Sequence, residues 1–300
     1  MLERLALAMS PAYVPHPTVL RQAPLSFDDF AKRTDDELDP VLGAVLIAGD
    51  FANAPVDPAQ IQASFEALAR PLLRTAWTDR SLEDQANALR EELASSHGFV
   101  GDEDDYYDPQ NSFLQTVLER KRGIPISLAL VYIEVARRAG MLARGVGFPG
   151  HFLVRIDRDL TGSEPPVFID AFFGGRIATK AVLGDLLART GASGTDIPEA
   201  LLAPISSRAL LQRMLMNLRN VFLHRGEFGK ALLVVDRVLA LSPMLAEAIF
   251  DRGLISERAG LIAGARASFE EYLEKSPSGP NRKAAENRLR ILRARTLRSN

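Results

Sequence analysis

Three segments in the middle of the chain decide the fold: GIPISLALVYIEVARRAG (residues 123–140), HFLVRI (residues 151–156) and PVFIDAFF (residues 166–173). The first predicts a helix from about Pro125 to Arg138, because proline suits the first helical position and Gly140 suits the C-terminal stop. The other two are rich in β-branched and aromatic residues and predict a pair of strands. The middle of the chain is therefore expected to mix α and β structure.

The flanks of this block are predicted to be helical. Apolar residues recur at helical spacing after Ser26, Asp57 and Ser81, each of which suits a helix N-cap. Prolines interrupt residues 1–24, which are expected to form an irregular arm. Residues 190–204 are rich in small and turn-forming residues and predict a linker.

The C-terminal part carries an internal repeat. Three pairs of residues are each 34 positions apart: Gly226 and Gly260, Ala231 and Ala265, and Pro243 and Pro277. A period of 34 is that of the tetratricopeptide repeat, in which each unit is a pair of antiparallel helices. Arg252 stands where such a repeat usually has an apolar residue. The basic stretch at 281–298 is interpreted as a capping helix with a solvated face, because it lacks the interleaved aromatic residues of a nucleic-acid site.

Composition excludes several classes of function. The chain has 300 residues, of which 47% are hydrophobic and 25% charged, which is typical of a globular protein. It has no cysteine, which excludes disulfides, thiolate metal sites and a thiol nucleophile. Its four histidines are widely separated, so we predict no metal and no cofactor.

Charge and hydropathy bear on partners and location. The net charge of −2 argues against nucleic acid and anionic membranes as partners. No segment is apolar enough to span a bilayer, and the N-terminus makes a poor signal peptide. A cytoplasmic protein is expected.

Three residues of the central block form a candidate catalytic set. Ser127 is expected in the first turn of a helix, His151 at the start of a strand, and Asp170 near the end of the next strand. A carboxylate beside a histidine orients the imidazole as a base, and a helix N-terminus favours a nucleophile. Each residue also has a structural interpretation: a helix cap for Ser127, a satisfied histidine for His151 and a turn for Asp170.

The block from residue 106 to residue 175 resembles the transglutaminase-like core of the bacterial SirB-type family. The resemblance rests on residues 106–140, on GVGFPGHFLVR (145–155) and on FIDAFFGG (168–175). It implies an α+β fold: a helical N-terminal region on a papain/transglutaminase-like core, followed by an all-α tetratricopeptide-repeat domain. The expected segments are an arm at 1–24, the core with its helical N-terminal part at 25–190, and the repeats at 205–298.

The resemblance also implies which residues match the site of such enzymes. His151 and Asp170 match the histidine and aspartate of the family, whereas Pro125 stands where the helix should carry the cysteine. Ser127 lies two residues further on, and two helical residues rotate a side chain by roughly 200°. Either the helix start is rearranged so that Ser127 replaces the thiol, or the nucleophile is lost.

Three functions remain open at this point. The first is a non-catalytic or cryptic transglutaminase-like protein, with a regulatory role, that binds a peptide or protein partner through its cleft and its repeats. The second is a structural adaptor, and the third is a hydrolase or acyltransferase on a peptide or amide that uses Ser127, His151 and Asp170. Four further polar residues could bind a ligand or serve as salt bridges and caps, namely Asn111, Arg120, Glu134 and Arg155.

Overall fold

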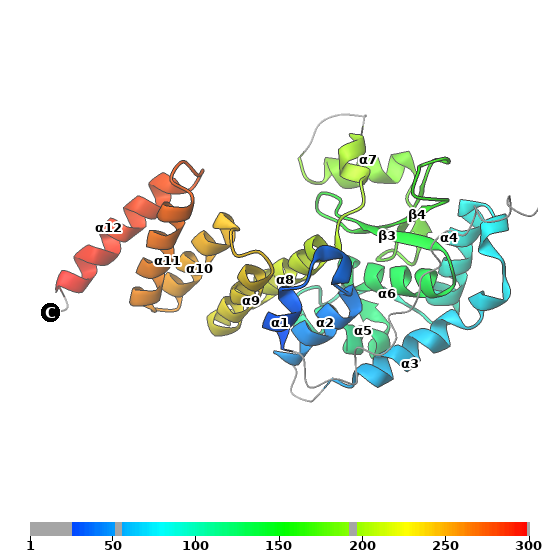
Figure 1. Cartoon of the computed structure of the whole chain (residues 1–300), viewed down its shortest axis with the longest axis horizontal. Coiled ribbons are helices and arrows are strands. Elements are labelled where there is room, and N and C mark those ends of the chain that lie inside the picture. Colours follow the sequence, from blue (N-terminus) through cyan, green and yellow to red (C-terminus); the bar gives the residue numbers. More distant parts are fainter. Residues whose placement is uncertain (1–25, 52–55, 192–196, 299–300) are drawn as a thin grey trace, which may run out of the picture. The chain divides into compact units, whose positions relative to one another are not determined.

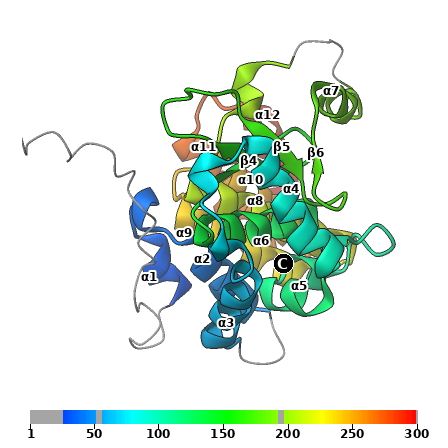
Figure 2. The same ribbon diagram turned by 90° about the vertical axis from the view of Figure 1, so that its right-hand side faces the viewer.

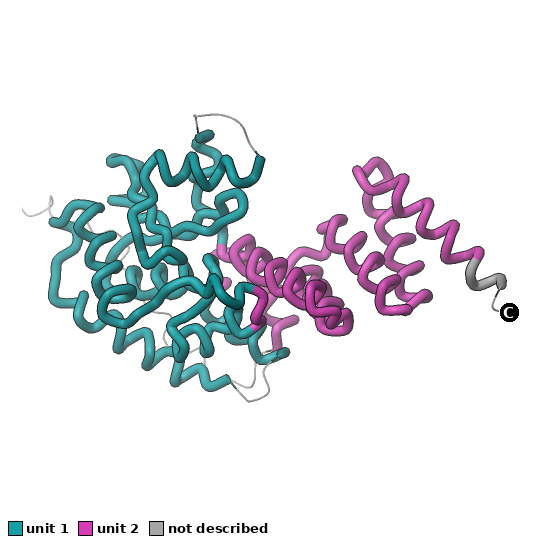
Figure 3. The backbone as a smooth tube through the Cα atoms, turned by 180° about the vertical axis from the view of Figure 1, so that it is seen from behind, with its two compact units in different colours: residues 1–25, 40–106, 110–206 teal, residues 26–39, 107–109, 207–300 magenta. Residues whose placement is uncertain are grey.

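The computed structural model describes residues 26–51, 56–191 and 197–298 (Figure 1). The chain divides into two compact units, which Figure 3 colours separately. Unit 1 holds residues 40–106 and 110–206, and unit 2 holds residues 26–39, 107–109 and those from 207 onward. The arm expected at residues 1–24 lies outside the described residues.

Unit 1 combines helices with a small sheet. Its α-helices are α2 (Pro40–Gly49), α3 (Pro58–Ala69), α4 (Leu82–Arg90), α5 (Leu114–Arg120), α6 (Pro125–Arg138) and α7 (Lys180–Ala188). A π-helical turn (Glu91–Ser96) follows α4, and 3-10 turns lie at Leu72–Arg74, Trp77–Asp79, Pro109–Ser112 and Glu199–Leu202. Its strands are β1 (Val100–Gly101), β2 (Arg122–Gly123), β3 (Leu142–Val146), β4 (Leu153–Asp157), β5 (Val167–Asp170) and β6 (Arg176–Ile177).

The central element of unit 1 is α6. Every residue from Pro125 to Ala136 is buried, including the polar Ser127 and Glu134, as expected of a mostly apolar helix in the core of a unit. It begins at Pro125 and ends before Gly140, whose φ of 86° suits a left-handed C-terminal position. The helix packs against α3 and against strands β3 and β4, so it forms the core on which the rest of unit 1 rests.

The four-stranded sheet is antiparallel, in the order β3-β4-β5-β6. β4 and β5 are in register with Val154 opposite Ile169, which confirms the strand pair predicted from the sequence. In both Figure 1 and Figure 2 the sheet lies between α7 and α6. On the α7 side, Leu153 and Phe168 pack with Leu183 and Leu186 of that helix. The sheet is therefore covered on both faces.

Two turns fix the ends of the central strands. Phe148-Pro149-Gly150-His151 closes through a hydrogen bond from the His151 N–H to the Phe148 carbonyl (3.0 Å), with a φ of 66° at Gly150. Proline followed by a left-handed glycine is typical of a type II turn. The sequence predicts one strand through residue 173, but β5 ends at Asp170 because its carboxylate accepts the Phe173 N–H and two left-handed glycines follow.

Unit 2 is built from helices. They are α1 (Phe27–Ala31), a 3-10 turn (Asp35–Glu37), α8 (Ser207–His224), α9 (Phe228–Leu241), α10 (Ala246–Arg258), α11 (Ile262–Lys275) and α12 (Arg282–Arg298). Gly226 and Gly260 take left-handed φ values of 71° and 76° at the two equivalent turns, which confirms the 34-residue period. Phe269, Tyr272 and Leu292 belong to the core that joins α10, α11 and α12.

Arg252 of α10 replaces an apolar repeat residue and makes a polar network instead. Its guanidinium donates to Ser268 (3.1 Å) and Glu271 of α11 and lies 3.8 Å from Asp236 of α9. The guanidinium of Arg252 thus links α9, α10 and α11. This explains how the second repeat tolerates a charge at a position that usually packs.

Residues 26–39 complete unit 2 from the other end of the chain. Ser26 caps α1 as predicted, and α1 packs on α9 with Phe27 and Phe30 buried. Arg237 binds Asp28 (2.9 Å), and Arg208 donates to the carbonyl of Ala31 (3.2 Å). None of the described helices combines the length and apolar character needed to cross a bilayer.

Candidate functional site

The structure brings together two of the three candidate catalytic residues. His151 leaves the type II turn just before β4, and Asp170 is the last residue of the neighbouring strand β5. Nε2 of His151 lies 2.8 Å from Oδ1 of Asp170, and both side chains are buried. The antiparallel pairing of β4 with β5 therefore creates an oriented histidine–carboxylate pair inside unit 1.

A third group, Arg176, shares this carboxylate. β6 pairs with β5 so that Arg176 lies directly opposite Asp170, and its Nη2 and Nε donate to Oδ2 at 3.0 and 3.3 Å. Burial would raise the pKa of Asp170, but the hydrogen bonds and charges of His151 and Arg176 outweigh it and hold that pKa below its usual value. Asp170 is thus an ionised carboxylate whose charge is balanced by a permanent cation.

Aromatic rings surround the pair. Phe172 meets the His151 ring edge-on, and Phe173 stacks with it, in each case with centroids 6.1 Å apart. The guanidinium of Arg176 lies 4.3 Å from the centroid of Phe173. A Cβ at Gly101 would lie 2.5 Å from the Phe172 ring, so this position can hold only glycine without a shift of the ring. These contacts fix the orientation of His151.

Ser127, the third candidate, is engaged elsewhere. It is fully buried in the first turn of α6, and its hydroxyl donates to the carbonyl of Asn111 (2.6 Å). Its oxygen also accepts the Ile124 N–H (3.1 Å). All of its hydrogen bonds within the described residues involve the backbone of Asn111 and Ile124, with none to His151. The hydroxyl therefore ties the start of α6 to the turn before α5.

The position that the resemblance assigns to the thiol is occupied by Pro125. This residue is the first of α6, it is buried, and it carries no side-chain group that can attack or donate. In the described structure, therefore, neither Ser127 nor Pro125 offers a nucleophile to the His151–Asp170 pair. The pair can bind or orient a group.

Tyr132 is a buried polar group that the sequence does not single out. It lies on α6, is fully buried, and its hydroxyl makes no hydrogen bond within the described residues. Burial raises its pKa above the usual value, and the nearby charge of Asp170 raises that pKa further, against an opposing contribution from Arg90. A Cβ at Gly175 would lie 2.6 Å from this hydroxyl, so Tyr132 packs directly under the turn that follows Asp170.

Three of the four other polar residues proposed as ligand groups make contacts within the fold. Asn111 is buried and donates to Asp102 (3.1 Å) and to the Asp105 carbonyl (2.8 Å). Glu134 binds Arg138 one helical turn away (2.6 Å). Arg155 binds Asp157 (2.8 Å), and Arg120 is exposed at the end of α5.

No metal centre emerges in residues 26–51, 56–191 and 197–298: no three His, Asp or Glu side chains gather there in a group that could hold an ion.

Sequence reasoning missed Arg176. Gly174 and Gly175 directly precede it and indicate a turn, but Ala171, Phe172 and Phe173 separate them from Asp170. A two-residue reversal at the glycines would place Phe173 opposite Arg176. The observed pairing of Asp170 with Arg176 depends on the end of β5 at Asp170, which the sequence pattern does not predict.

Comparisons with known proteins agree with this architecture. A family model described as "Transglutaminase-like superfamily" matches residues 59–216, and one described as "Tetratricopeptide repeat" matches residues 218–290. A UPF0162 protein of Xylella fastidiosa (strain 9a5c) is 36% identical over 82% of this chain and 88% of its own length. A UPF0162 protein of Vibrio cholerae is 25% identical over 78% of this chain and 87% of its own length.

A eukaryotic protein matches a shorter part. F-box only protein 21 of Homo sapiens is 34% identical over 43% of this chain and 20% of its own length. No solved structure matches the chain.

Proposed function

The chain belongs to the transglutaminase-like superfamily, and we propose that it is a non-catalytic member that binds a peptide or protein partner. One observation carries the proposal. The chain has no cysteine, and Ser127, which stands nearest to the thiol position among the hydroxyl residues of α6, has its hydroxyl bound to the backbone. The attached repeats favour a role in protein interaction, since stacked helix pairs offer extended binding surfaces.

The electrostatics of the His151–Asp170 pair support this interpretation. In a hydrolase the buried carboxylate stabilises the imidazolium that forms during reaction. Here Arg176 already balances the charge of Asp170 from 3.0 Å, so less of that charge is left for an imidazolium. His151 and Asp170 thus belong to a His–Asp–Arg cluster with balanced charge. Such a cluster is better suited to binding a group or to stabilising the fold than to catalysis.

The alternative is a hydrolase or acyltransferase that uses Ser127, His151 and Asp170. It draws support from the 2.8 Å His–Asp contact. To act, Ser127 would have to release the Asn111 carbonyl and reach the imidazole, and a serine hydroxyl needs a base within about 2.6–3.2 Å. This alternative therefore requires a rearranged start of α6.

Four finer points are part of the proposal. We infer a SirB-type affiliation, a regulatory role and a cytoplasmic location. We also propose the division into an arm at 1–24, a core at 25–190 and repeats at 205–298, with residues 26–39 packed in unit 2 beside the repeats. The adaptor function differs from the proposed one only in that His151 would have no part in binding.

Labelling with a fluorophosphonate probe, together with a panel of amide and ester substrates, tests the proposal on the full chain. The expected result is no labelling and no turnover by the wild type. Acyl transfer that disappears in His151→Ala and Ser127→Ala, but persists in His97→Ala, would establish the enzyme instead. His97 is a suitable control because it is an exposed histidine paired with Glu92 (3.0 Å).

Partner binding separates the proposed function from the adaptor. Peptides selected from a display library on the full chain are measured against wild type, His151→Gln and His97→Gln. The proposal expects a binding loss in His151→Gln alone for at least one selected peptide class. A library that enriches no peptide at all would overturn the proposal, and equal binding by the three proteins would leave only the adaptor.

A further inference from the structure

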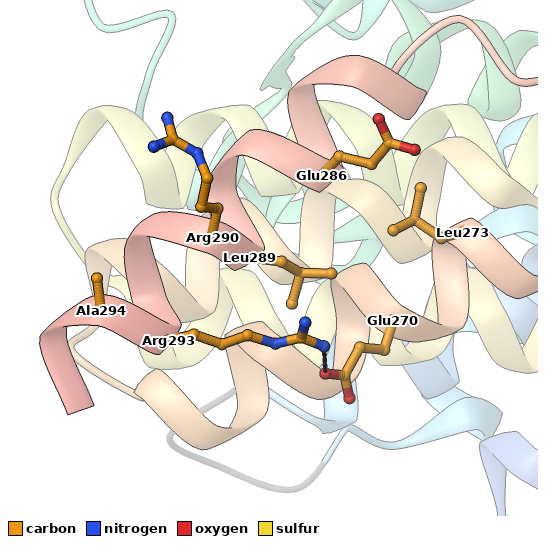
Figure 4. Close-up of a pocket in the computed structure, with 7 residues that line it drawn as sticks. All are labelled: Glu270, Leu273, Glu286, Leu289, Arg290, Arg293 and Ala294. Atoms are coloured by element: carbon orange, nitrogen blue, oxygen red, sulfur yellow. Dashed lines mark hydrogen bonds and ion pairs between the residues drawn. The ribbon is translucent and has the colours of Figure 1, made fainter. Parts of the chain in front are cut away.

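The end of the repeat array carries a groove. It has a volume of about 640 Å³ and lies between α11 and α12, the last two helices of the described chain. Leu273, Leu289 and Ala294 provide its apolar surface. Figure 4 shows Leu289 between Arg290 and Arg293 on α12, with Leu273 on α11 beside it. Grooves between two helices are a recurrent site for a third, amphipathic helix.

Some of the charged side chains that line this groove form ion pairs, and one does not. Arg293 binds Glu270 across the groove (3.0 Å), as Figure 4 shows, and Glu286 is bound by Arg282 (2.9 Å). Arg290 donates to the neutral amide oxygen of Asn287 (2.9 Å) and forms no ion pair with any described carboxylate. Both acidic residues of the groove are thus neutralised, and one cation at its edge is not.

We infer that this groove binds an acidic amphipathic helix of a partner protein, with aliphatic side chains on Leu273 and Leu289 and a carboxylate on Arg290. Charge complementarity selects this occupant. A basic helix would place its cations against Arg290, the one cation of the lining that no described carboxylate neutralises, whereas a second copy of α12 would bring a further arginine-rich face against this one. The inference rests on the proposed protein-binding role and names the surface and the class of partner.

A display selection on the full chain tests the inference. The library consists of 14-residue helices with leucine at helical spacing and with glutamate, glutamine or lysine at the other positions. The wild type is the target and Ala294→Trp is the counter-target, because Ala294 is exposed and its replacement fills the groove without removing a core residue. We expect the enriched helices to be rich in glutamate.

A synthetic helix from this selection is then measured by fluorescence anisotropy. Arg290→Glu should weaken binding about three- to tenfold, and Ala294→Trp about tenfold or more, with tenfold equal to about 1.4 kcal/mol. Lys283→Glu is the matched control, since it makes the same charge change on an exposed part of α12 outside the groove. It should change the affinity less than twofold.

Several results would overturn the inference. These are enrichment of basic or uncharged helices, equal binding by all variants, an equal loss in Lys283→Glu, or no enriched helix. A wild type that self-associates in sedimentation, and loses this in Ala294→Trp, would assign the groove to a second copy. A helix that binds the wild type but is insensitive to Arg290→Glu and Ala294→Trp refutes the groove and leaves the proposed protein-binding function intact.

Discussion

Replacing Ser127 with alanine is expected to destabilise unit 1, because the hydroxyl is a structural tie. It is fully buried and joins the Asn111 carbonyl to the Ile124 N–H at 2.6 and 3.1 Å. Ser112 is the matched control. It is also a buried serine in the same unit, but its hydroxyl makes no hydrogen bond within the described residues. The two substitutions delete the same atom from differently bonded sites.

The expected magnitudes follow from those bonds. A hydrogen bond contributes about 0.5–1.5 kcal/mol net, and Ser127 makes two good ones. The two backbone groups it joins also contact each other at 3.3 Å, so they are not left wholly unsatisfied. We therefore expect Ser127→Ala to lower the free energy of unfolding by about 1–2 kcal/mol, which is about 2–8 °C in Tm. Ser112→Ala should change it by about 0.5 kcal/mol or less, because no bond is lost.

Urea unfolding followed by tryptophan fluorescence measures this difference. The chain has one tryptophan, Trp77, which lies in unit 1 and donates to the Leu72 carbonyl (2.9 Å), so the signal reports on the relevant unit. Equal stability of Ser127→Ala and Ser112→Ala would refute the structural role of the Ser127 hydroxyl. A Ser127→Ala protein more stable than wild type would point to a site strained for catalysis instead.

Two further predictions concern the same unit. Because the folded pKa of Asp170 lies below its unfolded value of about 3.9, the ionised carboxyl stabilises the fold above that pH and stops doing so as pH falls through the folded pKa. The Tm advantage of wild type over Asp170→Asn, measured by calorimetry, should therefore be present at pH 7 and shrink below pH 4; a gap of constant size contradicts this. Gly175→Ala, with a φ of 71° and a Cβ 2.6 Å from the Tyr132 hydroxyl, should cost about 1–3 kcal/mol in urea unfolding, and Tyr132→Phe in the same chain should recover part of it. Gly184→Ala on α7, whose Cβ meets nothing within 4 Å, should cost nothing, and a similar loss in both glycine variants would argue against the contact.

Local signals in the sequence account for much of the fold. Proline at 125 and glycine at 140 bound α6, and the Asp57-Pro58 and Ser81 signals mark the starts of α3 and α4. β3 is harder to predict, because Arg144 and Gly145 interrupt its apolar pattern. Arg144 is accommodated by an ion pair with Asp157 of β4 (2.8 Å), a long-range contact that no local rule describes.

The candidate site also has a part that could be predicted from the sequence and a part that could not. The approach of His151 to Asp170 follows from two neighbouring strands and could be inferred from the sequence. The bonding of Ser127 could not, because its partner Asn111 lies 16 residues away in a turn whose position depends on tertiary packing. Arg176 required knowledge of where β5 ends. Roles of these residues in catalysis or binding stay predictions that the experiments above address.

The place of α1 in unit 2 has a consequence for synthesis on the ribosome. Asp28 and its partner Arg237 are 209 residues apart, and Phe27 and Phe30 are buried against a helix that begins at Phe228. At a translation rate of about 5–20 residues per second, the N-terminal phenylalanines wait roughly 10–40 s for that helix to emerge. During this interval the nascent chain exposes an aromatic segment that is covered only when the repeat helices have been made.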